Sequence, residues 1–183
     1  MKKYELTAEF IEKWGKKLFR IKALISFGSV EAGELGGYVE KEDNLAQDGD
    51  AWVYGNARVY GDAEVHGNAE VCGNAWVYGN ARVYGNARVS GDAEVYGNAD
   101  YLLIGHIGSR FSFTTFFKNK DKGITVYCGC FLGTIAEFRA KVTDTHGNNK
   151  HAKMYNLAAD MAELQILGEE HFDKLNTNKS EPF

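Results

Sequence analysis

AWVYGN ARVYGD AEVHGN AEVCGN AWVYGN ARVYGN ARVSGD AEVYGN, residues 51–98, repeats one six-residue pattern eight times without an insertion. In each hexad Ala and Val stand two positions apart, so an extended strand directs both to one side and their neighbours to the other. Gly followed by Asn or Asp tolerates positive φ and turns the chain after four strand residues. Each hexad therefore predicts one strand and one corner, as in a solenoid.

Three such sides close a coil of eighteen residues. Successive coils would stack at about 4.8 Å through parallel backbone hydrogen bonds, with Ala and Val inside. Eight hexads give a little under three coils, so the pattern predicts a short triangular β-helix. Val39 and Leu45 precede Ala51 by twelve and six residues, which predicts a degenerate first turn.

The hexad register resembles the hexapeptide-repeat superfamily, closely over residues 51–98 and loosely over 39–50. This resemblance implies a left-handed parallel β-helix, and the hand is taken from it alone. The lead-in GELGGYVEK, residues 33–41, followed by NLAQ at 44–47, is similar to uncharacterised bacterial and phage or prophage proteins labelled polymer-forming or acyltransferase. A phage or prophage origin is what that likeness implies.

The segments around the repeat predict a cap at each end, because an open β-helix exposes unpaired strand edges. In residues 1–38, Thr7 followed by Phe10, Ile11, Trp14 and Leu18 predicts a short helix, and 18–27 a strand, giving an N-terminal α/β cap. The β-helix itself is expected over 39–102. A polar tail is expected over 173–183.

Residues 103–172 lack the hexad repeat, and their pattern predicts a ββαα unit. Two β-rich runs around the turn KNKDKG indicate a hairpin over 103–131. Thr134 and Glu137 form a capping-box pattern that begins a helix ending near Gly147. A second helix from about Lys150 is expected to face the core with the residues that recur at three and four: Met154, Leu157, Ala158, Met161 and Leu164.

Composition narrows the class of protein. The chain has 183 residues, 44% of them hydrophobic, and a net charge of −4, which disfavours a nucleic-acid partner. The N-terminus lacks the apolar core of a signal peptide and no run reaches transmembrane length, so no membrane partner is expected. Three cysteines are too few for a disulfide scaffold, and a reducing cytoplasm is therefore the expected location.

Stacking at eighteen residues assigns the outward residues to three sides of the coil. Opposite charges then meet in neighbouring coils: Glu70 faces Arg88, and Arg82 lies between Glu64 and Asp100. The sides are Trp52 and Tyr54, Glu70 and Cys72, Arg88 and Ser90; then Arg58 and Tyr60, Trp76 and Tyr78, Glu94 and Tyr96; then Glu64 and His66, Arg82 and Tyr84, Asp100 and Leu102.

The second side carries a ladder of aromatic residues, and an exposed aromatic strip is typical of a contact surface. We expect this side to be a subunit interface, and the family resemblance implies a trimer. The interface would consist of Arg58, Tyr60, Trp76, Tyr78, Glu94 and Tyr96. In the alternative, the ladder only stabilises its sheet or is covered by the chain's own cap.

Catalytic and metal chemistry find little support. The resemblance implies, as an alternative, an acyltransferase using acetyl-CoA, for which His66 beside Tyr84 is the candidate on the coil. Cys128 and Cys130 lie closer together than zinc ligands usually do, and are expected to be small buried hydrophobes. His146 and His151 are expected to be loop residues, so no metal and no cofactor are predicted.

These observations favour a non-enzymatic, oligomerising β-helix scaffold that presents its C-terminal unit to a partner. The resemblance to phage and prophage proteins suggests a host defence component as the partner. Acyl transfer at an intersubunit groove and a purely structural, polymer-forming role are the alternatives.

Overall fold

The computed structural model describes residues 1–177, except for the side chains of 174–177. The chain divides into two compact units, Met1–Asn98 and Ala99–Phe183. The predicted tail over 173–183 is wrong for residues 173–177, which belong to a helix over Glu169–Thr177, and residues 178–183 lie outside the described part. Among the described helices, none is long and apolar enough to cross a membrane.

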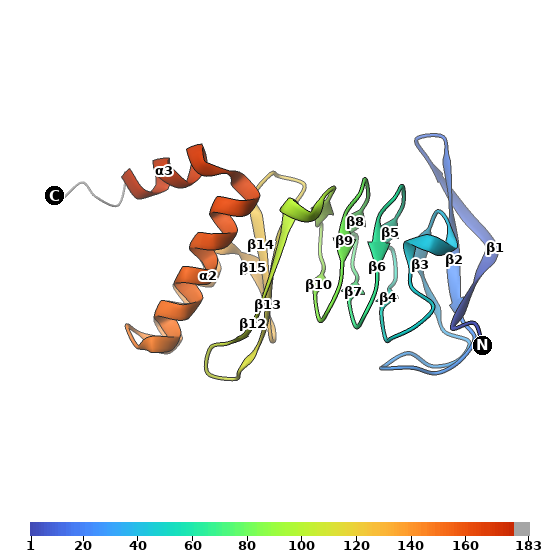
Figure 1. Ribbon diagram of the computed structural model, residues 1–183, viewed down its shortest axis with the longest axis horizontal. Helices are drawn as coiled ribbons and strands as arrows, with labels where there is room; N and C mark the ends of the chain where they lie inside the picture. The colour runs from blue at the N-terminus through green and yellow to red at the C-terminus, as the bar shows by residue number, and fades with distance from the viewer. Residues whose placement is uncertain (178–183) are drawn as a thin grey trace. The chain divides into compact units, whose positions relative to one another are not determined.

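The eight hexads form eight short strands that wind into a β-solenoid of about three turns (Figure 1). Each strand pairs in parallel with the strand three hexads along, which gives the sides β4–β7–β10, β5–β8–β11 and β6–β9. The predicted eighteen-residue coil is therefore confirmed, whereas its left hand stays a prediction. The strands are β4 (Trp52–Val53), β5 (Arg58–Val59), β6 (Glu64–Val65), β7 (Glu70–Val71), β8 (Trp76–Val77), β9 (Arg82–Val83), β10 (Arg88–Val89) and β11 (Glu94–Val95).

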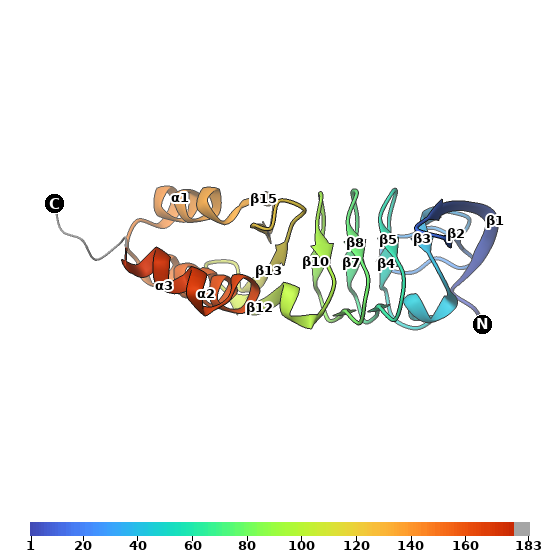
Figure 2. The ribbon, with the colours of Figure 1, turned by 90° about the horizontal axis from the view of Figure 1, so that it is seen from above.

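The interior of the solenoid consists of the Ala and Val of every hexad. All sixteen side chains are at most 1% exposed, from Ala51 and Val53 in the first hexad to Ala93 and Val95 in the last. Figure 2 views the stacked turns from another side. Because the same two small side chains recur at each level, every turn offers the next a matching inner surface.

The corner glycines carry two separate constraints, and a matched pair of variants separates them. Gly73 (φ +71°) and Gly91 (φ +69°) share the left-handed region, but only at Gly73 would a Cβ meet the next turn, 2.8 Å from the Gly91 nitrogen. Gly91→Ala is expected to cost about 1–2 kcal/mol of backbone strain. Gly73→Ala should cost about 1–3 kcal/mol more through overpacking. Urea unfolding followed by tryptophan fluorescence measures both, and equal losses would contradict the stacking argument.

The N-terminal residues form an antiparallel hairpin, so the helix expected from Thr7 to Leu18 is wrong. β1 (Tyr4–Lys13) and β2 (Lys16–Ala23) join through Trp14 and Gly15, both at positive φ, as in a two-residue hairpin turn. β3 (Leu35–Val39) pairs with β2 and with β5. The sheet order β1-β2-β3-β5-β8-β11 shows that the cap extends one side of the solenoid and leaves no open edge at β3.

The first coil is anchored by buried polar groups. Val39 pairs with Val59 and Leu45 bridges to Val65, which confirms the degenerate first turn. It contains the short 3₁₀ helix η1 (Glu42–Asn44), whose Asn44 is fully buried and donates its amide to the carbonyls of Gly61 and Ala63. The Asn44 side chain thus makes hydrogen bonds to the chain beside β6, where a regular first coil would have a strand.

Trp52 was expected to point outward, but it is fully buried. Tyr4 and Phe27 cover it, with ring centroids at 6.0 and 5.4 Å. A Cβ on Gly36 would lie 2.7 Å from the Trp52 ring, so the bare backbone of β3 makes room for it. The N-terminal segment therefore closes over the first side of the solenoid.

Lys3 belongs to the same closure. Its buried ammonium donates to the carbonyls of Asp48, Gly49 and Ala51, and lies 4.9 Å from the Phe27 ring centroid. Burial lowers the pKa of Lys3 to about 8, although Asp48 and Asp50 act in the opposite direction. The amine thus ties the N-terminus to the first irregular corner.

In its described residues, the second unit is a four-stranded antiparallel sheet with three α-helices. The sheet order is β12-β13-β14-β15, so the expected hairpin over 103–131 is instead three strands and the start of a fourth. The elements are β12 (Tyr101–Ile107), β13 (Ser112–Lys118), β14 (Ile124–Cys128), β15 (Phe131–Thr134), α1 (Ile135–His146), α2 (Lys150–Leu167) and α3 (Glu169–Thr177). The run IGHIGSRFSFTTFF reads as one β-rich segment, but it turns back on itself after Ile107.

The strand expected to continue the third side of the solenoid does not form. Residues Asn98–Asp100 adopt the 3₁₀ helix η2, and Asp100 pairs with Lys118 at 3.2 Å. Leu102 belongs to β12 and pairs with Phe116. The last complete rung on that side is therefore β9.

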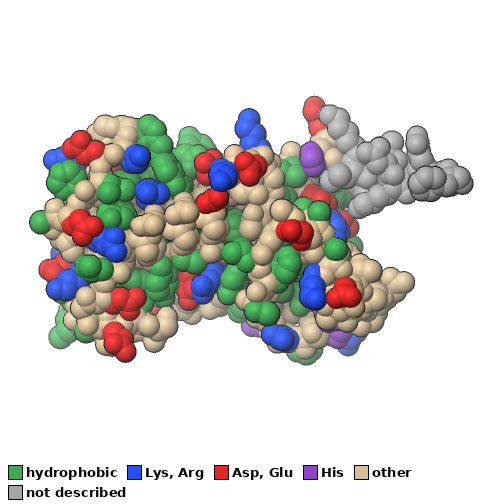
Figure 3. Space-filling model, turned by 180° about the vertical axis from the view of Figure 1, so that it is seen from behind, with side chains coloured by type: hydrophobic (Ala, Val, Ile, Leu, Met, Phe, Trp, Pro, Cys, Tyr) green, Lys and Arg blue, Asp and Glu red, His purple; other side chains and the backbone are tan. Residues whose placement is uncertain are grey.

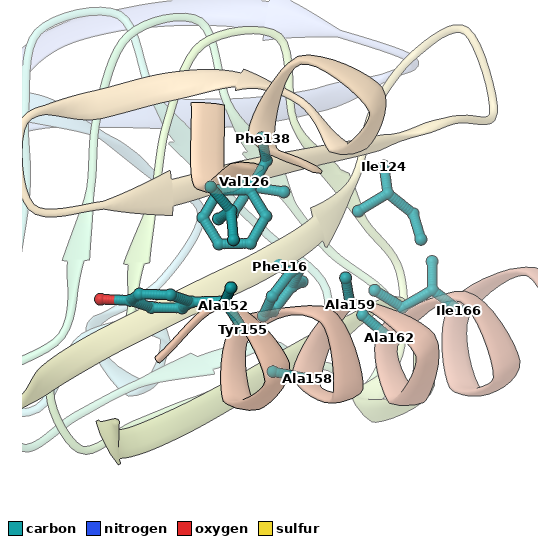
Figure 4. Packing of buried hydrophobic residues seen from close by; sticks show 11 residues of the cluster. Phe116, Ile124, Val126, Phe138, Ala152, Tyr155, Ala158, Ala159, Ala162 and Ile166 are labelled. Atoms are coloured by element: carbon teal, nitrogen blue, oxygen red, sulfur yellow. The ribbon is translucent and has the colours of Figure 1, made fainter. Parts of the chain in front are cut away.

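Both predicted helix starts are confirmed. Thr134 and Glu137 form the capping box of α1, and the Asn149 side chain accepts from the backbone of His151 and Ala152 at the start of α2. Figure 4 shows α2 packing small side chains against Phe116, Val126 and Phe138. The rings of Phe116, Phe138 and Tyr155 fill most of this core. Most other side chains on the buried face of α2 are therefore alanines, which fit the space that remains.

Candidate self-association surfaces

The predicted aromatic ladder exists on the second side of the solenoid. Tyr60 and Tyr78 stack with ring centroids 5.1 Å apart and planes within 10°. Tyr78 meets Tyr96 edge to face at 5.3 Å. Figure 3 shows hydrophobic side chains gathered on part of one face of the N-terminal unit, between charged ones. The eighteen-residue register thus places the three tyrosines in one row.

The chain's own hairpin turn covers part of this ladder. Trp14 packs against Trp76 at 4.5 Å and against Tyr60 at 5.7 Å. The Arg58 guanidinium also lies 5.1 Å from the Trp76 ring centroid, as a cation–π contact. Of the six predicted interface residues, only Tyr96 is largely exposed, at 60%, while the others, including Glu94, are half-buried.

Packing in the ladder changes the acidity of a tyrosine. Burial raises the pKa of Tyr60 to about 12, and the neighbouring Tyr78 and Glu94 act in the same direction. The Tyr60 phenol is therefore a weaker acid than an exposed tyrosine.

Two of the predicted charge pairs form between neighbouring coils. Arg88 forms an ion pair with Glu70, and Arg82 lies 3.5 Å from Glu64. These partly exposed pairs contribute little stability each, on the order of 1 kcal/mol or less. Their main effect is to oppose slippage of one coil against the next.

The alternative catalytic pair lies on the third side. His66 and Tyr84 stack with ring centroids 5.6 Å apart and planes within 19°. Both occupy ordinary outward positions of their hexads. The rings stack as those of Tyr60 and Tyr78 do, so the stacking is explained by the register.

The C-terminal cysteines and histidines differ from expectation in part. Cys130 is exposed in the turn after β14, so its predicted burial is wrong, and Cys128 is half-buried at the end of β14. His146 ends α1 and His151 lies in the first turn of α2, where they were expected in a loop. Their rings lie 5.8 Å apart.

An exposed apolar face on α2 differs from the sequence-based prediction. Four large side chains of α2, expected in the core, point away from it. Met154, Leu157, Met161 and Leu164 are 39, 63, 57 and 44% exposed. Their spacing of three, four and three residues places them in one stripe along the helix, like the a and d positions of a coiled coil. The buried face holds Ala152, Tyr155, Ala158, Ala159, Ala162 and Ile166.

The charges beside this stripe are separated along the chain. Lys150 and Lys153 lie exposed in the first turn of α2. Glu169 and Glu170 lie exposed in the first turn of α3, directly after α2 ends. Within the described side chains none of these four forms an ion pair with its own chain. The stripe therefore has a basic end and an acidic end.

Comparison with known proteins supports the repeat. A family model described as the YdcK beta solenoid repeat matches residues 51–67 and 81–97. Both segments lie in the solenoid, so this similarity and the strand pairing agree on the fold of the hexads. Among curated proteins no match to the chain is found.

Proposed function

We propose that this protein is a non-enzymatic scaffold that self-associates through the exposed face of α2, with the solenoid as a rigid spacer. The observation that carries the proposal is the stripe Met154, Leu157, Met161 and Leu164, basic at one end and acidic at the other. A contiguous exposed apolar face of this kind is typical of a protein contact.

A second copy in antiparallel orientation is the partner that fits this stripe. A twofold axis near residue 159 brings Met154 opposite the partner's Leu164 and Leu157 opposite the partner's Met161. The same axis places Lys150 opposite the partner's residue 168, beside Glu169 of the partner subunit. A parallel pair would instead set like charges against each other. Such an isologous contact closes at a dimer.

The finer identity comes from the sequence resemblance and stays a prediction. It comprises the left-handed hexapeptide family, the phage or prophage origin, the cytoplasmic location and the host partner. A trimer through the aromatic ladder stays a prediction as well. Because Trp14 covers Trp76 and Tyr60, the ladder offers less free apolar surface than α2 does.

Solution mass tests the proposal. We expect the wild-type chain, of 20.3 kDa, to sediment at twice this mass at equilibrium. Leu157→Asp should weaken the dimer at least about tenfold, because a charge would be placed in the centre of the contact. Leu35→Asp is the matched control, since Leu35 is 48% exposed on β3. Thermal unfolding of each variant checks that the fold is intact.

A charge swap tests the orientation. Lys150→Glu should weaken the dimer, and the added change Glu169→Lys should restore it. A wild-type monomer, or an unchanged mass in Leu157→Asp, would contradict the proposal. Loss of assembly in Tyr96→Glu alone would assign the contact to the aromatic ladder. Mass that grows with concentration beyond that of a dimer would favour the polymer-forming alternative, and stabilisation by acetyl-CoA would favour acyl transfer.

A further inference from the structure

A cavity of about 470 Å³ opens in the second unit, within the range usual for small-molecule sites. It lies between the β12–β13 turn, the turn after β14, helix α1 and the start of α2. Its lining includes Arg110, Phe131, Phe138, Lys141, Val142 and Thr145.

The inner wall of the cavity is aromatic and apolar. Phe138 stands between Phe131 and Tyr155, with ring centroids at 5.6 Å to each. Val142 lies on the next turn of α1 and is buried, as Phe138 is. Such a wall suits a flat ring or a short alkyl chain.

The lining of the cavity holds basic side chains and no acidic ones. Arg110, Lys141 and His146 are basic, and none of the lining residues carries a carboxylate. The Arg110 guanidinium lies against Gly129, 3.8 Å from where a Cβ would stand. Asp144, outside the lining, pairs with Lys141 at 3.2 Å, but both side chains are highly exposed, so this pair is weak. The cavity therefore favours an anionic group at its mouth.

The floor of the cavity is held in place before any ligand arrives. The Cys128 thiol, which neighbours the Tyr155 hydroxyl, accepts a hydrogen bond from Thr114 Oγ1 at 3.2 Å. Gly108 lies against the same hydroxyl, where any Cβ would collide with it. Figure 4 shows that the Tyr155 oxygen points away from the alanines of α2. A site with fixed walls spends little free energy on ordering.

We propose that this cavity binds a small carboxylate that carries an aromatic ring or a short alkyl chain. The apolar part lies against Phe131, Phe138 and Val142. The carboxylate accepts hydrogen bonds from Arg110 and Lys141 at the mouth. The proposal does not depend on self-association, because the lining residues and the α2 stripe are different sets.

Calorimetric titration with 4-phenylbutyrate and with its neutral amide tests this site. The acid should bind at least about tenfold more tightly than the amide, because charge-assisted hydrogen bonds are stronger than neutral ones. Arg110→Gln with Lys141→Gln should remove that difference. Lys122→Gln, an exposed change in the β13–β14 turn outside the lining, is the control.

A filling variant tests the location. Thr145→Trp, at an exposed position on α1, should block binding without touching the core. Far-ultraviolet circular dichroism checks the helices. The proposal is overturned if the amide binds as tightly as the acid, if Thr145→Trp binds as the wild type does, or if the acid shows no saturable binding in the millimolar range.

Discussion

Trp52→Ala is expected to lower the free energy of unfolding of the N-terminal unit by about 4 kcal/mol. Trp52 is fully buried under Tyr4 and Phe27 and against the backbone of Gly36. Removing the indole would leave a cavity that these rigid neighbours cannot collapse to fill. The loss includes no hydrogen bond, because the Trp52 Nε1 atom has no partner in the described structure.

The repeat itself provides the control for this change. Trp76 occupies the same position of an identical hexad, AWVYGN, but is half-buried under Trp14. Trp76→Ala should cost about half as much or less, since the surrounding groups are nearer solvent. Urea unfolding followed by tryptophan fluorescence measures both, because all three tryptophans lie in the N-terminal unit. Equal losses would show that position in the hexad, and not the cap, determines the contribution.

Arg139→Ala is expected to destabilise the second unit by about 3 kcal/mol. Arg139 Nη2 lies 2.7 Å from both Asp160 and Glu163, and Nη1 donates to Asn156 at 3.2 Å. The Glu163 side chain is 8% exposed, so truncation of the arginine would leave a buried carboxylate without its cation. This network joins α1 to α2, and its loss should loosen both helices.

Lys141→Ala is the matched control on the same helix. Its pair with Asp144 has side chains 63 and 74% exposed, so its loss should cost less than about 0.5 kcal/mol. Adding Glu163→Gln to Arg139→Ala should recover part of the stability, because the buried charge is gone. Circular dichroism at the helical band reports this unit, since all described α-helices belong to it. A neutral effect of Arg139→Ala would contradict the account.

The solenoid could be predicted in detail because its signal is local and repeated. The pairing of Glu70 with Arg88 and of Tyr60 with Tyr78 follows from counting eighteen residues. Counting cannot say what covers a side of the coil. Trp52 and Trp76 are indistinguishable within their hexads, and only distant residues, Phe27 for one and Trp14 for the other, make them different.

The N-terminal helix failed for a related reason. Phe10, Trp14 and Leu18 fit a helical spacing. The edge of β3, however, would be left with unpaired backbone groups unless β2 formed as a strand and paired with it. The useful signal was the Trp14-Gly15 pair, which suits a two-residue turn with positive φ at both positions. Pairing over a long distance therefore outweighed a weak local pattern.

Helix α2 has two apolar stripes. The sequence pattern predicted that the stripe of larger side chains would face the core, whereas the other stripe does. Met154, Leu157, Met161 and Leu164 are larger than the alanines of the opposite face, so they were expected in the core. The core volume is already filled by Phe116, Phe138 and Tyr155, which leaves room only for small side chains between them. Of the expected core residues only Ala158 is buried, and the larger set became the candidate contact surface.

Because the corners of successive coils are aligned, the solenoid can change its length only in whole coils without changing which residues share a side. An insertion of eighteen residues would add one rung of about 4.8 Å and return the chain to the same side. An insertion of six or twelve would make it leave from a different side, with every later residue placed on a new face. The rows of opposite charges and of tyrosines stay aligned only when a whole rung is inserted or deleted. We therefore expect this solenoid to tolerate insertions and deletions of three hexads, and not of one or two.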